Sequence, residues 1–363
     1  MKHVILCLQI SLLFSSFSYS MQAQYSSIFS FGDSYTDTGN KVILLGPSTP
    51  GLLINKPPYG MTFFGHPTGR LSDGRLVIDF IGPKLQARRA NFAVAGATAL
   101  KTSTSPSFYP QAGGDDGAKP PPNNISLSDE LGWFDAMKPT LCDSPQACKE
   151  FFGKALFVVG ELGFNDYGVM LAAGKLAKPS LKRSPTCLRS SQQSLMPRRY
   201  KLINDGATAI VVSGISPMGC APGNLVLLGS QNGADYEPDT GCLKGLNDLS
   251  RSHNAQLSQA LTTLGGKYPG TRVTYADLYA PVIAFAAAPA RFGFDGALRD
   301  CCCGGKYNFD LKAACGMPGV AACANPSAYV DWDGVHLTEA AYHLVADGWL
   351  RGPYANPPIL GAS

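Results

Sequence analysis

The sequence predicts an α/β protein in which helices cover both faces of a parallel β-sheet. Three observations support this prediction: short apolar runs recur along the chain, most of them end at or near a glycine, and amphipathic stretches with helical spacing lie between them. Strands of a parallel sheet are apolar over their whole length because both faces of such a sheet are covered.

The expected strands are the apolar runs at 27–31, 91–95, 155–159, 207–214 and 271–275. Helices are expected at 243–264 and 338–350, the second with Thr338 as its N-cap. Ser34, Gly96 and Asn165 each come shortly after an expected strand. Active sites of parallel sheets form beyond the carboxyl ends of the strands, so these three residues are expected to share one rim.

Size and composition allow one large or two ordinary globular domains, and no low-complexity stretch divides the chain. The chain has 363 residues, 45% of them hydrophobic and 15% charged, with no internal repeat, which allows a large buried core. The formal charge of +4 and the absence of a basic-aromatic pattern argue against nucleic acid as a partner.

The N-terminus has the layout of a secretory signal peptide. A basic start at Lys2 leads into an apolar stretch over 4–17, and small residues follow at Ser18, Ser20 and Ala23. The stretch is too short to span a bilayer stably, so residues 1–23 are expected to be removed and 24–363 to form the domain. A retained anchor is the alternative.

The cysteine content predicts disulfides in a secreted chain. Cys7 lies in the signal, and ten cysteines remain. The spacings of Cys142/Cys148 and Cys315/Cys323 suit small loops, although spacing leaves the connectivity open. No Cys-x2-Cys pairs alternate with histidines, so neither zinc nor any other metal is expected. Asn124, in Asn-Ile-Ser, is the predicted glycosylation site.

Catalytic residues are suggested at both ends of the chain. Ser34 lies in Phe-Gly-Asp-Ser-Tyr, and Asp333 precedes His336 by three residues. A serine needs a base, and the base works best when a carboxylate orients it. His336 is the one histidine in a loop with carboxylates close by. Asp333 is the expected acid and Asp331 the rival, while Asp33 is interpreted as structural.

An oxyanion hole completes the predicted site. The attacked carbonyl needs preorganised hydrogen-bond donors. The candidates are the backbone amides of Ser34 and Gly96 and the side-chain amide of Asn165. The Gly-x-Ser-x-Gly elbow of α/β-hydrolases is absent around Ser34.

Two segments have unusual composition. The proline-rich loop at 46–75 carries Tyr59, Phe63 and Phe64, which either form walls for an acyl or aromatic substrate or pack under a long loop. The segment 178–202 is atypical and basic, with a crossover helix expected but no helical period. Between 171 and 206 there is one acid, Asp205, against eight basic residues: Lys175, Lys178, Lys182, Arg183, Arg189, Arg198, Arg199 and Lys201.

Four blocks resemble those of the plant GDSL esterase/lipase family, part of the SGNH hydrolase superfamily. They are Phe-Gly-Asp-Ser-Tyr-Thr-Asp-Thr-Gly-Asn at 31–40, Asn-Phe-Ala-Val-Ala-Gly-Ala-Thr-Ala at 91–99, Gly-Glu-Leu-Gly-Phe-Asn-Asp-Tyr at 160–167 and Asp-Gly-Val-His at 333–336. Pro-Thr-Gly-Arg at 67–70, Asp-Gly-Arg at 73–75 and Pro-Met-Gly-Cys at 217–220 add marks outside the site. Tyr35 replaces the usual leucine, and Phe164 stands where a small residue is frequent.

The resemblance implies a flavodoxin-like three-layer α/β/α fold with about five parallel strands. It implies a nucleophile at Ser34, a base at His336, an acid at Asp333, and oxyanion donors at Gly96 and Asn165. The expected protein is a secreted, monomeric esterase or lipase of the cell wall or apoplast, active in lipid degradation without a cofactor or integral membrane association. Its partner would be a small or polymer-linked ester. The alternatives are an acyltransferase, or an inactive or misassembled isoform whose segment 178–202 comes from a splice boundary.

Overall fold

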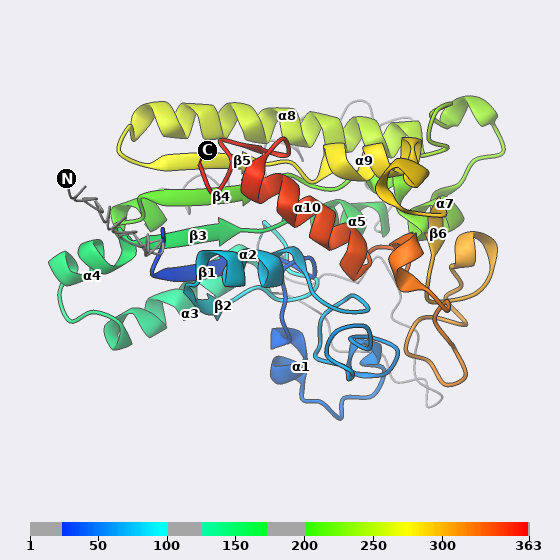
Figure 1. The fold of residues 1–363 in the computed structure, drawn as a ribbon, viewed down its shortest axis with the longest axis horizontal. Coiled ribbons are helices and arrows are strands. Elements are labelled where there is room, and N and C mark those ends of the chain that lie inside the picture. The colour runs from blue at the N-terminus through cyan, green and yellow to red at the C-terminus, as the bar shows by residue number, and fades with distance from the viewer. Residues whose placement is uncertain (1–23, 101–124, 173–200, 362–363) are drawn as a thin grey trace, which may run out of the picture.

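The computed structural model describes residues 24–100, 125–172 and 201–361. Its main sheet has six strands in the order β2-β1-β3-β4-β5-β8. The first five pair in parallel and β8 pairs antiparallel with β5, so the predicted parallel α/β sheet is confirmed. The parallel strands follow the flavodoxin-like order 2-1-3-4-5. Figure 1 shows their side-by-side arrangement.

The strands of the main sheet are β1 (Ser27–Phe31), β2 (Arg88–Asn91), β3 (Ala155–Val159), β4 (Ala209–Ser213), β5 (Arg272–Ala276) and β8 (Ala355–Asn356). A second, two-stranded sheet pairs β6 (Gly296–Asp300) with β7 (Tyr329–Asp331). The α-helices are α1 (Asn40–Leu45), α2 (Val77–Leu85), α3 (Leu127–Met137), α4 (Pro145–Phe152), α5 (Phe164–Ala172), α7 (Pro222–Leu228), α8 (Lys244–Lys267), α9 (Tyr279–Ala287) and α10 (Glu339–Arg351). The short 3-10 helices are η1 (Leu53–Asn55), η2 (Lys138–Thr140), η3 (Met218–Cys220), η4 (Gly233–Asp235), η5 (Pro289–Phe292), η6 (Lys306–Asn308) and η7 (Pro326–Ala328).

Helices pack on both faces of the main sheet because successive strand residues point to opposite sides. On one face Ile28 and Leu156 pack with α2, α9 and α10. On the other face Phe29 and Phe157 stack at 5.3 Å and pack with α3, α4 and α8. In Figure 1, α10 (red) crosses in front of the strands and α2 lies beside it. The chain therefore has the three layers that the sequence predicted.

One strand was predicted in the wrong place. The apolar run at 91–95 was expected to be a strand, but β2 is Arg88–Asn91, a half-exposed edge strand. The amide of Phe92 still donates to the Ser30 carbonyl at 2.8 Å. The amide of Ala95 instead donates to the side chain of Asp37. The apolar residues after β2 thus form the loop that leads to Gly96.

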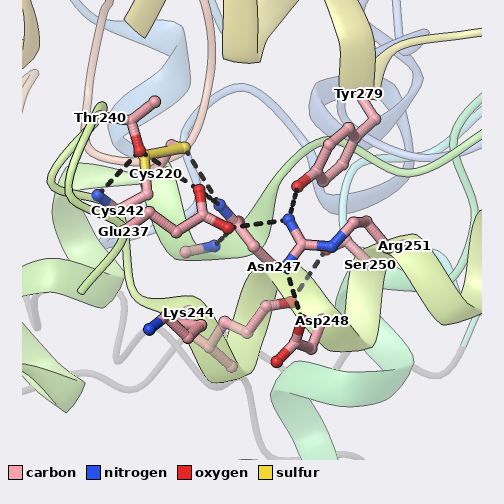
Figure 2. A network of polar contacts seen from close by, with 12 residues as sticks. Cys220, Glu237, Thr240, Cys242, Lys244, Asn247, Asp248, Ser250, Arg251 and Tyr279 are labelled. Atoms are coloured by element: carbon pink, nitrogen blue, oxygen red, sulfur yellow. Dashed lines mark hydrogen bonds and ion pairs between the residues drawn. A yellow bond between two sulfur atoms is a disulfide. The ribbon is translucent and has the colours of Figure 1, made fainter. Parts of the chain in front are cut away.

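The loop after β4 is tied to α8 by a polar network, shown in Figure 2. The side-chain oxygen of Asn247 accepts from the amide of Gly219 at 2.9 Å, and its nitrogen donates to Glu237 at 3.0 Å. Arg251 donates to Glu237 and to the hydroxyl of Tyr279. This network fixes the Pro-Met-Gly-Cys block at 217–220 against α8.

Three predictions concern residues that lie wholly or mostly outside the described ranges. The signal peptide (1–23) and Asn124 lie there, as does most of the basic segment. Of that segment the structure describes Lys201 and Leu202. The ammonium of Lys201 pairs with Asp135 at 2.6 Å and with Asp205 at 2.8 Å. Residues 201–204 are helical and lead toward β4. Among the described residues, no helix has the length and apolar character needed to cross a membrane.

Four disulfides link described cysteines: Cys142–Cys148, Cys220–Cys242, Cys301–Cys323 and Cys302–Cys315. The loop suggested by the spacing of Cys142 and Cys148 is confirmed. The spacing of Cys315 and Cys323 was misleading, because each of them bonds a different member of the pair Cys301 and Cys302. These two consecutive residues follow β6, and their amides donate to the carbonyls of Asp331 and Trp332. Two disulfides therefore brace the segment that leads to Asp333.

Candidate active site

Ser34 lies in a tight turn directly after β1. Gly32 has φ of 138°, and a Cβ there would come within 3.1 Å of the Gly160 Cα, so the turn passes too close to β3 for a larger residue. The amide of Gly32 donates to Glu130 at 2.9 Å, and the amide of Asp33 donates to the Glu161 carbonyl at 3.2 Å. These bonds fix the serine at the carboxyl end of the sheet.

The structure brings Ser34, His336 and Asp333 into one chain of hydrogen bonds. The Ser34 Oγ lies 2.8 Å from His336 Nε2. His336 Nδ1 lies 2.8 Å and 2.9 Å from the two carboxylate oxygens of Asp333. Ser34 and His336 are 6% and 7% exposed, so these hydrogen bonds are largely shielded from bulk water, while a small part of each residue stays accessible to solvent. The hydroxyl is within reach of a base, and the base is within reach of a carboxylate.

The carboxylate of Asp333 differs from its acidic neighbours. Burial raises its pKa, but the charge of His336, hydrogen bonds from His336 and one from Tyr59 together hold that pKa below its usual range. Burial raises the pKa of Asp331 to about 8 and that of Asp300 well above the usual value. Asp333 is therefore the one of the three carboxyls whose surroundings favour the charged form, whereas burial favours the neutral form of Asp331 and Asp300.

The three candidate oxyanion donors differ in whether they already donate a hydrogen bond. Within the described part of the chain, the backbone amides of Ser34 and Gly96 donate to no other group. The side-chain nitrogen of Asn165, at the start of α5, already donates to Asp33 Oδ2 at 2.8 Å and to the Ala97 carbonyl at 3.1 Å. An oxyanion would have to displace one of these acceptors from Asn165. The Ala97 carbonyl is the more distant of the two.

Three residues have contacts that sequence reasoning missed. Asp33, interpreted as structural, contacts Asn165 directly. The hydroxyl of Tyr35 donates to the Val335 carbonyl at 2.6 Å, and its ring lies 5.5 Å from that of His336. Tyr59 is 5% exposed, and its hydroxyl donates to Asp333 Oδ2 at 2.8 Å. Each contact joins segments far apart in the chain, so no local pattern could show it.

A serine that contacts a histidine, which in turn contacts a carboxylate, is the arrangement typical of serine hydrolases. Here it lies at the carboxyl end of a flavodoxin-like sheet. The comparisons with known proteins define the class further. Residues 28–349 match the family of GDSL-like lipases and acylhydrolases. The chain belongs to this family, whose members are carboxylic ester hydrolases.

The similar proteins include several GDSL esterase/lipases of Arabidopsis thaliana. One is 41% identical, with 99% of this chain and 90% of the relative covered. Another is also 41% identical, with 92% of this chain and 86% of the relative covered. A solved structure of a GDSL-like lipase from Parabacteroides merdae is 14% identical, with a TM-score of 0.37 over 90% of this chain and 94% of its own.

Proposed function

We propose that this esterase is secreted and cleaves carboxylic esters through an acyl-enzyme formed on Ser34. The observation that carries the proposal is the 2.8 Å contact between Ser34 Oγ and His336 Nε2, with Asp333 on the other ring nitrogen. The disulfides support an oxidising compartment, because such bonds form and persist there.

In the proposed mechanism, His336 takes the Ser34 proton as the oxygen attacks the ester carbonyl. The imidazolium that forms lies against the charged Asp333, which stabilises it. The amides of Ser34 and Gly96 and the side chain of Asn165 stabilise the oxyanion. His336 then gives its proton to the leaving alcohol. Water, deprotonated by the same histidine, releases the acid and restores Ser34.

Ser34→Ala tests this proposal. The variant keeps the fold and loses the attacking oxygen, so hydrolysis of p-nitrophenyl acetate should fall by about 10³-fold or more. A fluorophosphonate probe should label the parent protein and not the variant, because labelling needs an activated serine. Undiminished turnover by Ser34→Ala would refute the assignment. A parent protein that neither turns over esters nor takes the label would indicate the inactive isoform.

A further inference from the structure

The proline-rich loop at 46–75 reaches the acid of the proposed triad through one side chain. Tyr59 follows a cis peptide bond between Pro57 and Pro58 and is almost fully buried. Its hydroxyl donates to Asp333 Oδ2 at 2.8 Å, the same distance as the bond from His336 to Oδ1. His336 Nδ1 also lies 2.9 Å from Oδ2, so both donors bind one carboxylate, and Tyr59 contacts it through Oδ2.

The ring of Tyr59 is held in place on several sides. It lies 6.0 Å from the indole of Trp332 in an edge-to-face arrangement. It packs in a cluster with the disulfide-bonded Cys301, Cys302 and Cys315. The next residue, Gly60, has φ of 73°, and a Cβ there would come 2.3 Å from the His66 carbonyl oxygen. The hydroxyl therefore has little freedom to leave Asp333.

The same loop is also fastened to the helix that follows His336. Asp73 accepts a hydrogen bond from the amide of Glu339, the first residue of α10, at 2.7 Å. The carboxylate of Glu339 accepts from the amide of Arg75 at 2.8 Å and from its guanidinium at 2.7 Å. The loop thus holds the segment from Asp333 to Glu339 at both of its ends.

From this arrangement we infer that Tyr59 is a positioning residue of the catalytic apparatus. Its hydroxyl orients the Asp333 carboxylate toward His336 and stabilises the ionised form of that carboxylate. This inference rests on the proposed acyl-enzyme chemistry. It replaces the two earlier interpretations of Tyr59, as a wall of the substrate pocket or as packing beneath a loop.

The donor role agrees with the electrostatics around Asp333. Burial and the nearby carboxylate raise the pKa of Tyr59 well above its usual value, so the phenol keeps its proton. The charged or titratable groups that interact with Asp333 are Tyr59, Asp300, Asp331, Cys303, His336 and Tyr342. Burial raises the pKa of Asp300, of Asp331 and of the Cys303 thiol, so it favours the uncharged form of all three.

Tyr59→Phe removes the hydroxyl and leaves the ring. The Asp333–His336 pair then binds a proton more tightly, because one donor no longer stabilises its negative charge. The acid limb of the pH profile of kcat/KM should move to higher pH by about half a unit to one unit, and kcat should fall about tenfold. KM should stay within about twofold, since Tyr59 does not contact substrate in this proposal. The rate of fluorophosphonate labelling should follow the same shifted profile.

Tyr329→Phe is the matched control. Tyr329 packs against the same cluster, and its hydroxyl makes no hydrogen bond within the described residues. The control should keep the parent pH profile. A Tyr59→Phe variant with an unmoved acid limb, or with a KM that changes with acyl length, would overturn the inference and favour the substrate wall.

A double-mutant cycle separates positioning from general packing. In an Asp333→Asn background, Tyr59→Phe should slow labelling less than twofold, because the carboxylate it serves is gone. An undiminished tenfold effect there would assign the loss to structure alone. If Tyr59→Phe does not fold, 3-fluorotyrosine at position 59 gives a stronger donor of nearly the same shape and should move the acid limb to lower pH. An acid limb unmoved by that replacement would also overturn the inference.

These outcomes distinguish failure of this inference from failure of the proposed function. An inactive Ser34→Ala combined with an unmoved acid limb in Tyr59→Phe refutes the role of Tyr59 alone. An active Ser34→Ala refutes the acyl-enzyme chemistry on which that role depends.

Discussion

Replacing Asp333 by asparagine tests the electrostatic role of the acid. Asp333 accepts from His336 Nδ1, from the hydroxyl of Tyr59 and from the amides of Val335 and His336. Asparagine offers one acceptor oxygen and no charge, so it can satisfy only part of this donor set. In the proposed mechanism, the variant therefore loses the negative charge that faces the imidazolium when His336 takes the serine proton.

The size of the effect follows from the geometry. The carboxylate oxygens lie 2.8 Å and 2.9 Å from Nδ1, which sets the two charge centres roughly 4 Å apart. At an effective dielectric constant of about 20, two unit charges at that separation attract by about 4 kcal/mol. Each tenfold in rate corresponds to ~1.4 kcal/mol, so kcat should fall by about 10³-fold.

The assay is steady-state hydrolysis of p-nitrophenyl acetate from pH 5 to 9, with spontaneous hydrolysis subtracted and folding checked by circular dichroism. Asp331→Asn is the matched control, because the same substitution two residues away removes a carboxyl that is neutral in the folded protein near pH 7. It should keep kcat within about twofold. A folded Asp333→Asn variant with kcat within tenfold of the parent would refute the reasoning. An inactive Asp331→Asn would transfer the role to the rival acid.

The remaining two predictions concern stability. Folding raises the pKa of the Asp331 carboxyl from 3.8 to about 8. Between these two pH values the unfolded chain binds fewer protons than the folded protein. The free energy of unfolding therefore falls as pH rises, by up to ~1.4 kcal/mol per pH unit. Asp331→Asn should remove that slope in urea unfolding between pH 5 and 8; an unchanged slope contradicts the assignment. Gly334→Ala should lower the unfolding free energy by about 2 kcal/mol or more, because Gly334 has φ of 97° and a Cβ would lie 2.2 Å from the Phe309 ring. Urea unfolding measures this loss, and parental stability would contradict the steric argument.

The central strands were predictable because burial on both faces dictates their composition. Ser27–Phe31 and Ala155–Val159 are the very runs that the apolar pattern marked. The edge strand β2 escaped prediction because it lies at the margin of the sheet, where Arg88 and Arg89 can point to solvent. The apolar residues after it are buried but lie in a loop. The apolar run therefore predicted correctly that these residues are buried, and wrongly that they form a strand.

The proximity of Ser34, Asp333 and His336 could be anticipated, because their chemistry requires it. The contact between Tyr59 and Asp333 could not be predicted, because the two residues are 274 positions apart. The proline-rich loop at 46–75 also has no periodicity from which the orientation of the Tyr59 side chain could be inferred. The pairing of Cys315 with Cys323 that the spacing suggested was wrong for a similar reason. Sequence spacing favoured the short loop, whereas β6 and β7 bring Cys301 and Cys302 close to both.

Three consecutive residues join the separate parts of the proposed site. Asp33 contacts Asn165, Ser34 contacts His336, and the hydroxyl of Tyr35 holds the carbonyl of Val335, the residue before that histidine. A displacement of the turn after β1 therefore moves the proposed nucleophile, a proposed oxyanion donor and the proposed base together. The hydrogen bond to Asp33 also fixes the side-chain amide of Asn165 close to the turn that carries Ser34. In the proposed mechanism, Asn165 exchanges the Ala97 carbonyl for the substrate oxygen as negative charge develops on that oxygen. It keeps Asp33 as its other acceptor, because the bond to Asp33 is the shorter of the two.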